Sequence, residues 1–137
     1  MPDADYESAH ISYVGFIDPY AVEGMLILKD SDNKEFHMRA FSGEVARHIL
    51  NFTKRSDNAV PTIYQMFEEM CENNEMILVK IKVYESGDML RANLYFTGKN
   101  DIILRNYRAS DALALATLYN APILIRKKLL REPITSD

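Results

Sequence analysis

The stretch YRASDALALATLYNAPILI, residues 107–125, decides the predicted fold. Ser110 predicts a helix N-cap, because its hydroxyl can accept hydrogen bonds from first-turn amides, and Asp111 adds negative charge at the positive end of that helix. Asn120 can adopt the left-handed conformation that ends a helix, and Pro122 prevents the helix from resuming. The stretch therefore predicts a charged turn, a helix, a second turn and a short strand.

The predicted helix is apolar on nearly all sides. Within residues 112–119 only Thr117 is polar. Such a helix must be covered on more than one side by a sheet, by other helices or by a second copy of the protein. Because the chain is short, we expect a second copy to cover part of it, in a homodimer with closed two-fold symmetry.

This stretch resembles the bifunctional nuclease domain family, whose members carry an Arg-Pro-Ser-Asp-Ala turn, an Ala/Leu-rich helix and an Ala-Pro-Ile strand in this order. The family's upstream order is also similar: a strand, a glycine-containing turn followed by a Glu, a helix, a Pro-Leu-Thr-His-Asp segment that opens a second helix, and a hairpin. The resemblance covers roughly residues 10–130. It implies a metal-assisted nuclease, a hydrolase of phosphodiester bonds that acts on RNA or DNA, and it implies a homodimer.

The chain departs from the family pattern at several positions. Ala109 stands in place of the family's Pro, and Gly43 directly precedes Glu44 instead of lying a few residues ahead of it. Where the family has His-Asp, the segment after Pro61 reads Thr-Ile-Tyr-Gln. Losing that ionisable pair implies a weak or degenerate nuclease. The alternative is a non-catalytic dimeric binding or regulatory module on the same scaffold.

The remaining pattern completes an α+β prediction. Alternating or β-branched runs predict strands, and 3.6-residue periodicity predicts helices. The expected strands are 10–17, 24–29, 35–41, 77–84, 90–96 and 101–107, and the expected upstream helices begin at Ser42 and Pro61. We predict a single domain at 10–131, with three main helices packed on a mixed or mostly antiparallel sheet. Residues 1–9 are expected to be disordered or loosely held, and 132–137 to form a C-terminal tail.

Two apolar patterns predict which side chains face the core. In the helix after Pro61, the stripe consists of Ile63, Met66, Phe67, Met70 and Cys71. In the strand at 77–84, one face is expected to carry the apolar side chains at every second position: Ile77, Val79, Ile81 and Val83. The single cysteine excludes an intramolecular disulfide, and its place in the stripe favours a small core residue over a nucleophile.

Composition limits the class of protein. The chain has 137 residues, of which 47% are hydrophobic and 26% charged, as in an ordinary globular protein. No stretch is long and apolar enough for a membrane span, so no membrane association is predicted. The first five residues, MPDAD, are acidic where a signal peptide is basic, which favours a cytoplasmic location.

Charge is unevenly distributed along the chain. The formal net charge is −4, but the C-terminal third is basic: its cations between 99 and 131 are Lys99, Arg105, Arg108, Arg126, Lys127, Lys128 and Arg131. Such a segment can attract phosphate on an acidic protein, which makes nucleic acid a possible partner. A solvated basic tail is the alternative.

Candidate site residues follow from what phosphodiester cleavage requires, namely charge neutralisation, an activated water and support for the leaving oxygen. Arg108 could contact the phosphate, and Ser110 could donate a hydrogen bond. Asp111 and Glu44 could hold Mg²⁺ or Mn²⁺, since Mg²⁺ commonly uses one or two carboxylates together with waters and substrate oxygens. Helix capping and a salt bridge from Arg108 to Asp111 or Glu44 are the structural alternatives. Glu44 and His48 share a helix face and could also ligate an ion.

No motif for an organic cofactor is present. The sequence has no Gly-rich loop ending in Gly-Lys-Ser/Thr, no Gly-x-Ser-x-Gly and no His-Glu-x-x-His. Residues 30–33, DSDN, open like a calcium loop but lack its glycine and terminal Glu, so a hairpin turn is the better interpretation.

Overall fold

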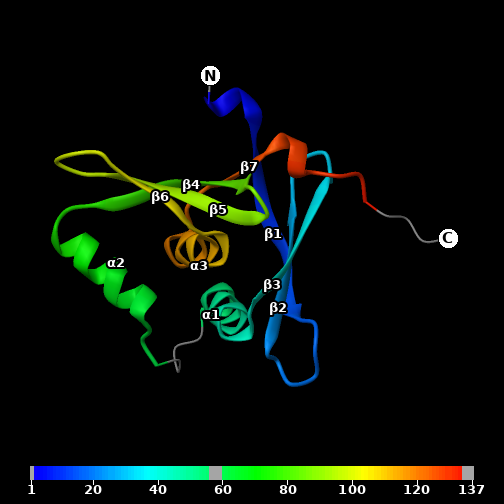
Figure 1. The fold of residues 1–137 in the computed structure, drawn as a ribbon. Helices are drawn as coiled ribbons and strands as arrows, with labels where there is room; N and C mark the ends of the chain where they lie inside the picture. Colours follow the sequence, from blue (N-terminus) through cyan, green and yellow to red (C-terminus); the bar gives the residue numbers. More distant parts are fainter. Residues whose placement is uncertain (1, 56–59, 134–137) are drawn as a thin grey trace.

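The structure of the chain is a computed structural model that describes residues 2–55 and 60–133 (Figure 1). Its strands are β1 (Tyr6–Phe16), β2 (Glu23–Lys29), β3 (Glu35–Ser42), β4 (Ile77–Ser86), β5 (Met89–Thr97), β6 (Ile102–Arg108) and β7 (Ile123–Arg126). Its helices are α1 (Gly43–Lys54), α2 (Ile63–Asn73) and α3 (Ala109–Tyr119), with short 3-10 turns η1 (Pro2–Asp5) and η2 (Lys127–Leu129). The α+β prediction with three main helices is confirmed.

All seven strands form one mixed sheet in the order β3-β2-β1-β7-β4-β5-β6. Neighbours are antiparallel except β4 and β7, which run parallel. β1 joins the two halves: Tyr6 to Ala9 pair with β7, and His10 to Phe16 pair with β2. The register of β1 shifts between Ile11 and Tyr13, and the two halves of the sheet are strongly inclined to each other (Figure 1).

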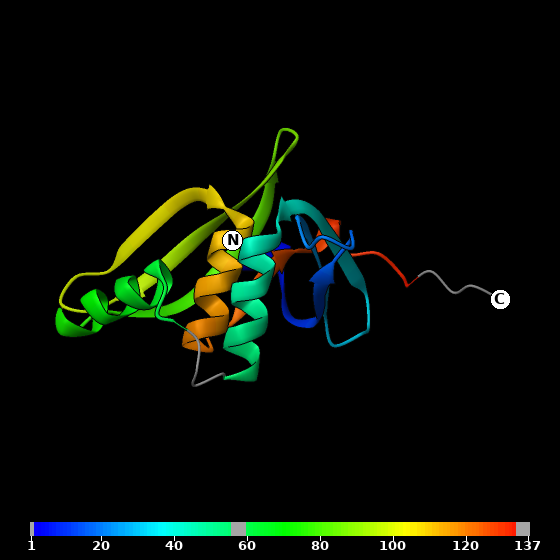
Figure 2. The same cartoon turned by 90° about the horizontal axis from the view of Figure 1, so that it is seen from below.

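The helices fill the angle between the two halves of the sheet. α1 packs on β1 and β2, α3 packs on β4, β5 and β6, and the two helices lie side by side (Figures 1 and 2). α2 contacts α3 on its other side. Because a sheet and two helices surround α3, its apolar surface is covered within the chain. The apolar surface of α3 therefore gives no reason to expect a homodimer, and a homodimer would have to form through another surface.

Only the C-terminal end of α3 matches the prediction. The helix begins at Ala109 after Arg108, which supplies no side-chain cap, and Ser110 lies inside the first turn with 6% of its surface exposed. The prediction of Ser110 as N-cap is therefore wrong, because the strand continues into the helix without the expected turn residue. Asn120 has φ 58° and ends the helix as predicted.

The other two helices are capped by hydroxyl side chains. The helix predicted to begin at Ser42 is α1, and the Ser42 hydroxyl accepts a hydrogen bond from the amide of Glu44 as its N-cap. α2 begins at Ile63, two residues later than expected, because Thr62 is its N-cap. Thr62 and Gln65 form a reciprocal capping box.

Two predicted core faces are only partly buried. Ile63, Met66 and Met70 of α2 are 69%, 59% and 63% exposed, whereas Cys71 is buried as predicted. The ring of Phe67 packs edge-on against Phe96 in the sheet. In β4 a register shift follows Leu78, so that the buried set becomes Leu78, Ile81 and Val83, while Ile77 and Val79 are exposed. An inserted residue turns the following side chains to the opposite face.

The chain boundaries also differ from the prediction. β1 begins at Tyr6, so residues 6–9, expected to be loosely held, form strand pairs inside the sheet. Residues 134–137 of the expected tail lie outside the described part of the chain. The Asp30 turn joins β2 to β3 as a hairpin, as predicted. Within residues 2–55 and 60–133, no helix has the length and apolar character needed to cross a bilayer.

Candidate functional site

The N-terminal turns of all three helices border one open cleft of about 830 Å³. Its wall consists of Ser42, Glu44, Val45, His48, Val60, Pro61, Thr62, Ile63, Tyr64, Arg108 and Asp111. A helix N-terminus carries partial positive charge and favours anions. The cleft therefore combines a shape and an electrostatic setting that suit a phosphate-bearing ligand.

Three of the four predicted site residues meet in this cleft. Glu44 comes from the first turn of α1, Arg108 from the end of β6, and Asp111 from the first turn of α3. Ser110 does not line it. Its buried side chain lies instead beside a second hollow between β3 and the β4–β5 hairpin. The structure thus gives Ser110 no place in the cleft with the other three.

Asp111 is the centre of a hydrogen-bonded cluster. Arg108 donates from Nε to Oδ2 at 2.8 Å and from Nη2 to Oδ1 at 3.2 Å. Tyr64 donates from its hydroxyl to Oδ1 at 2.7 Å. Charge-assisted and bidentate bonds of this kind fix both partners in orientation. The predicted ion pair of Arg108 with Asp111 is confirmed, and Tyr64 joins it from α2.

The cluster sets the protonation of its donors. Partial burial, followed by the hydrogen bond to Asp111, raises the pKa of Tyr64 well above its ordinary value, so its hydroxyl stays protonated into the alkaline range. Asp111 likewise raises the pKa of Arg108. The negative charge of Glu44, which lines the same cleft, also raises the pKa of Tyr64. Both donors therefore keep their protons to a higher pH than they would in water.

The carboxylates of the cleft differ in their freedom to bind a cation. Asp111 accepts three hydrogen bonds, which leaves about one of its four lone-pair sites unused. Among the described residues, none forms a hydrogen bond or ion pair with the side chain of Glu44. Among the described residues of the cleft wall, Glu44 is therefore the carboxylate without a partner, and Asp111 is the one that is nearly saturated.

His48 adds a further polar group to the cleft. It lies one turn after Glu44 on α1, and its ring meets that of Tyr64 edge-on at 5.5 Å between centroids. Sequence reasoning considered His48 as a ligand only through its spacing from Glu44. For Tyr64, the sequence signal is its position after Pro61, where the resembled family has histidine.

One acidic group outside the cleft also has the spacing of metal ligands. The group consists of Glu7, Asp30 and Asp32, whose carboxylate oxygens lie within 4.8 Å of one another. Among the described residues, no other set of three or more His, Cys, Asp or Glu side chains is this close. Asp30 accepts hydrogen bonds from the amides of Asp32 and Lys34 at 2.9 and 2.8 Å. These bonds explain Asp30 as a residue of the β2–β3 turn.

Comparison with known proteins places this geometry in a family. The sequence model of the bifunctional nuclease domain matches residues 26–136. The match includes α1, α2 and α3 and all the cleft residues. None of the curated proteins matches the chain.

Proposed function

Because the chain belongs to the bifunctional nuclease domain family, we propose that its cleft hydrolyses phosphodiester bonds of RNA or DNA with the help of a divalent cation. The observation that carries the proposal is the convergence of Glu44, Arg108 and Asp111 on one open cleft. These residues come from three separate elements, and each offers a group that phosphodiester hydrolysis uses. The site lies at three helix N-termini, where anions are stabilised.

Each cleft residue has a distinct role in the proposed reaction. Arg108 is 63% exposed at its side chain, so it can bind a phosphate oxygen while Asp111 holds its orientation. Glu44 and Asp111 would hold Mg²⁺ or Mn²⁺. When bound, such an ion lowers the pKa of a coordinated water and stabilises the charge that develops on phosphorus.

The chemical step is an ordinary hydrolysis. A water oxygen forms a bond to phosphorus, the bond from phosphorus to the leaving sugar oxygen breaks, and that oxygen gains a proton. Arg108 neutralises charge on the non-bridging oxygens as it develops. His48 lies within the cleft, where an imidazole can serve as a general acid or base. We assign it the proton transfer to or from water.

Tyr64 occupies the position where the family has histidine. A tyrosine hydroxyl that keeps its proton cannot act as a general base at neutral pH. Tyr64 therefore orients Asp111 and does not transfer a proton. Because the ionisable histidine that the family has at this position is missing, we expect cleavage to be weak. The competing function, a dimeric module that binds its ligand without cleaving it, uses the same cleft and differs in lacking turnover.

A cleavage assay separates the two functions. We expect release of labelled fragments from single-stranded RNA or DNA oligonucleotides at low salt with Mg²⁺ or Mn²⁺, and none with chelator. Asp111→Ala should abolish cleavage. Arg108→Ala should reduce it by about 100-fold or more, because it removes charge stabilisation in the transition state. Thermal denaturation of each variant checks that folding is preserved.

Two exposed residues outside the cleft provide matched controls. Glu69→Ala on α2 and Lys54→Ala at the end of α1 remove the same charges as the site variants and should leave cleavage unchanged. All variants are purified in parallel, since a trace host nuclease would act equally in every preparation. Cleavage indifferent to chelator and to both site variants would reject the site. No cleavage in any metal would favour the binding module.

A further inference from the structure

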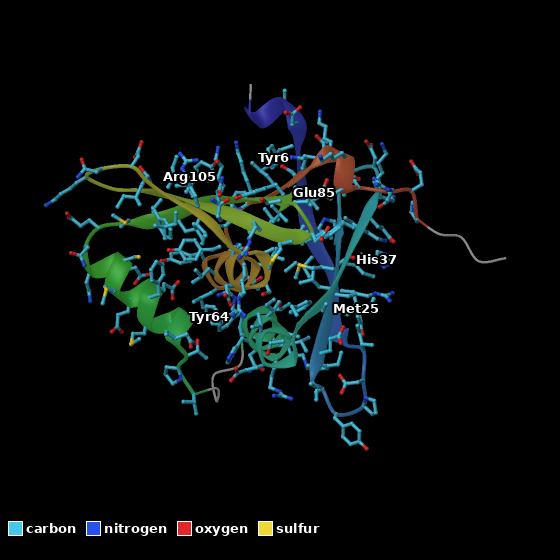
Figure 3. The ribbon with its side chains drawn as sticks, in the orientation of Figure 1. Tyr6, Met25, His37, Tyr64, Glu85 and Arg105 are labelled. Carbon is cyan, nitrogen blue, oxygen red and sulfur yellow. The ribbon has the colours of Figure 1, made fainter. Side chains whose placement is uncertain are left out.

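Tyrosine and arginine side chains gather on the face of the sheet that no α-helix of the described chain covers. α1, α2 and α3 all lie on the other side of β4, β5 and β6 (Figure 1). Since Leu78, Ile81 and Val83 face those helices, the alternate positions of β4 face outward. Figure 3 shows Tyr6 and Arg105 on this outer side, whereas Tyr64 lies among the helices.

The strand register aligns several of these side chains in a row. Tyr6 pairs with Arg126, Tyr84 pairs with Arg91, and Arg91 pairs with Arg108. Val83 of β4 pairs with Ile125 of β7, which makes Tyr84 and Arg126 the next neighbours. With about 4.8 Å between strands, a row across five strands spans about 19 Å. It leads from β1 to Arg108, a residue of the cleft.

The aromatic rings and cations of this face lie against one another. Arg126 Cζ lies 5.7 Å from the ring centroid of Tyr6 and 5.8 Å from that of Tyr84. Lys80 Nζ lies 5.1 Å from the ring centroid of Tyr95, on the neighbouring strand. The result is a surface of alternating flat rings and cationic groups.

The arginines of this face retain uncompensated charge. Across residues 2–55 and 60–133, none of Arg91, Arg105 and Arg126 forms a salt bridge, and the buried Nε of Arg126 has no hydrogen-bond partner. Arg91 donates only to the sulfur of Met89, and Arg126 to the hydroxyl of Tyr6. The lysines of β4 have interaction partners of their own within the chain. The uncompensated positive charge of this face is therefore that of the arginines. Three guanidinium groups on a protein of net charge −4 mark a local site for anions.

We propose that this cation–tyrosine face, made of Tyr6, Tyr84, Arg91, Tyr95, Arg105 and Arg126, binds single-stranded nucleic acid and leads it to the cleft. The proposal rests on the proposed function and assigns its substrate class. Guanidinium groups bind phosphates through paired hydrogen bonds, and unpaired bases stack on tyrosine rings and on arginine planes. A duplex hides the faces of its bases, so rings on a sheet select single strands.

The row of side chains across the sheet explains how one nucleic-acid strand could reach both the cation–tyrosine face and the cleft. Arg91 lies opposite Arg108 at the edge strand β6, and Arg108 borders the cleft. A nucleic acid whose phosphates lie along Arg126, Arg91 and Arg108 would pass from the outer face to the cleft and contact cationic side chains along the whole way. The face thus holds nucleotides next to the bond that is cut.

Binding is measured without cleavage, by fluorescence anisotropy of a labelled 12-nucleotide oligouridine or oligothymidine in excess chelator. Arg91→Gln and Arg126→Gln should each weaken binding and lower the slope of log K against log salt by about 0.7, as one phosphate contact is lost. Tyr95→Leu should weaken binding by about 5- to 150-fold with the slope unchanged, because stacking is not ionic. The same sequence as a duplex should bind less tightly than the single strand.

Lys54→Gln is the matched control, because it removes one exposed charge far from the face and should leave the affinity nearly unchanged. The chain has no tryptophan, so quenching of tyrosine fluorescence on binding, reduced in Tyr95→Leu, gives a second readout. In steady-state cleavage the face variants should raise KM with little change in kcat.

The outcomes separate this inference from the proposed function. Binding that the face variants weaken, with no cleavage in any metal, would uphold the face and reject the nuclease. Cleavage with face variants that bind like the wild type would uphold the nuclease and overturn the face. Equal or tighter binding of the duplex, or no binding of any oligonucleotide, would also overturn it.

Discussion

Asp111 shows how one side chain can serve stability and chemistry together. Its carboxylate sits at the positive end of α3, where negative charge is stabilising, and it accepts from Arg108 and Tyr64. Its side chain is still 32% exposed to the cleft. Because these contacts fix its orientation, a ligand in the cleft meets a carboxylate that is already in place.

The hydrogen bond from Tyr64 to Asp111 gives a pH-dependent prediction. The pKa of Tyr64 is raised in the folded protein, so as pH rises through about 10 the unfolded chain releases this proton while the folded chain keeps it. The free energy of unfolding should therefore fall with rising pH in that range. Tyr64→Phe should cost about 1 kcal/mol at pH 7, and this difference should shrink above pH 10.

Urea denaturation of both proteins between pH 7 and 11 measures the effect. The remaining tyrosines are common to both chains, so their titration cancels in the comparison. A difference between wild type and Tyr64→Phe that stays constant over this range would show that the hydrogen bond does not hold the proton.

The sequence predicted most of the cleft, but not how its residues are held. Glu44, Arg108 and Asp111 could be selected because charged residues at helix starts stand out in a linear pattern. Ser110 was wrong as a cap, since a strand that runs directly into a helix moves the first helical residue forward. Tyr64 lies 47 residues from Asp111, and no local pattern reveals a contact over that distance.

At the scale of elements, the start of α2 positions one wall of the cleft. Thr62 accepts from the amides of Tyr64 and Gln65, and Gln65 accepts from the amide of Thr62. Thr62→Ala should lower the free energy of unfolding by about 0.5–2 kcal/mol, because first-turn amides lose their acceptor. Thr62→Ser keeps the hydroxyl and should retain most of the stability.

Denaturation midpoints of the two Thr62 variants check the cap, and the cleavage assay checks its consequence. Loss of the cap should loosen Tyr64 and lower cleavage, whereas Thr62→Ser should remain close to wild type. Equal stability of the alanine and serine variants would contradict a role for the hydroxyl.

Element types were predictable where their patterns were long. The β4–β5 hairpin and the β1–β3 meander followed from alternating runs and turn residues. The expected apolar face of β4 was right for Ile81 and Val83 and wrong for Ile77 and Val79, because a single inserted residue near Val79 reverses the alternation and composition does not mark such a bulge. The apolar stripe of α2 was only half buried, because periodicity identifies a stripe but not what covers it.

At the scale of the whole molecule, α2 carries exposed apolar side chains on one face. Ile63, Met66 and Met70 form its most exposed apolar side chains, at 69%, 59% and 63%. We propose that a second copy covers them in a homodimer. Sedimentation equilibrium at micromolar concentration should then give twice 15.8 kDa.

Substitutions on α2 locate the interface. Met66→Lys should shift the equilibrium to the monomer, because it places a charge in the apolar contact. Glu69→Lys, on the exposed polar side of the same helix, should not. A single species of 15.8 kDa in the wild type would reject the homodimer.

The basic C-terminal third is distributed over the folded surface. Lys128 pairs with Glu85 at 3.1 Å, and Arg108 pairs with Asp111. Arg105 and Arg126 belong to the cation–tyrosine face. A linear count of charges could indicate the attraction for phosphate, but the register of β1, β7, β4 and β5 determined which cations lie together.

The position of β7 has a consequence for the order of folding. This short strand lies in the middle of the sheet, between β1 and β4, although it follows every other strand in the sequence. Tyr6 and Arg126, neighbours across β1 and β7, are 120 residues apart along the chain. During synthesis, the two halves of the sheet can form separately, each as local hairpins, but they have no strand to join them. Closing so long a loop is slow, so the two walls of the cleft come together only after β7 has been synthesised and has paired with both halves of the sheet.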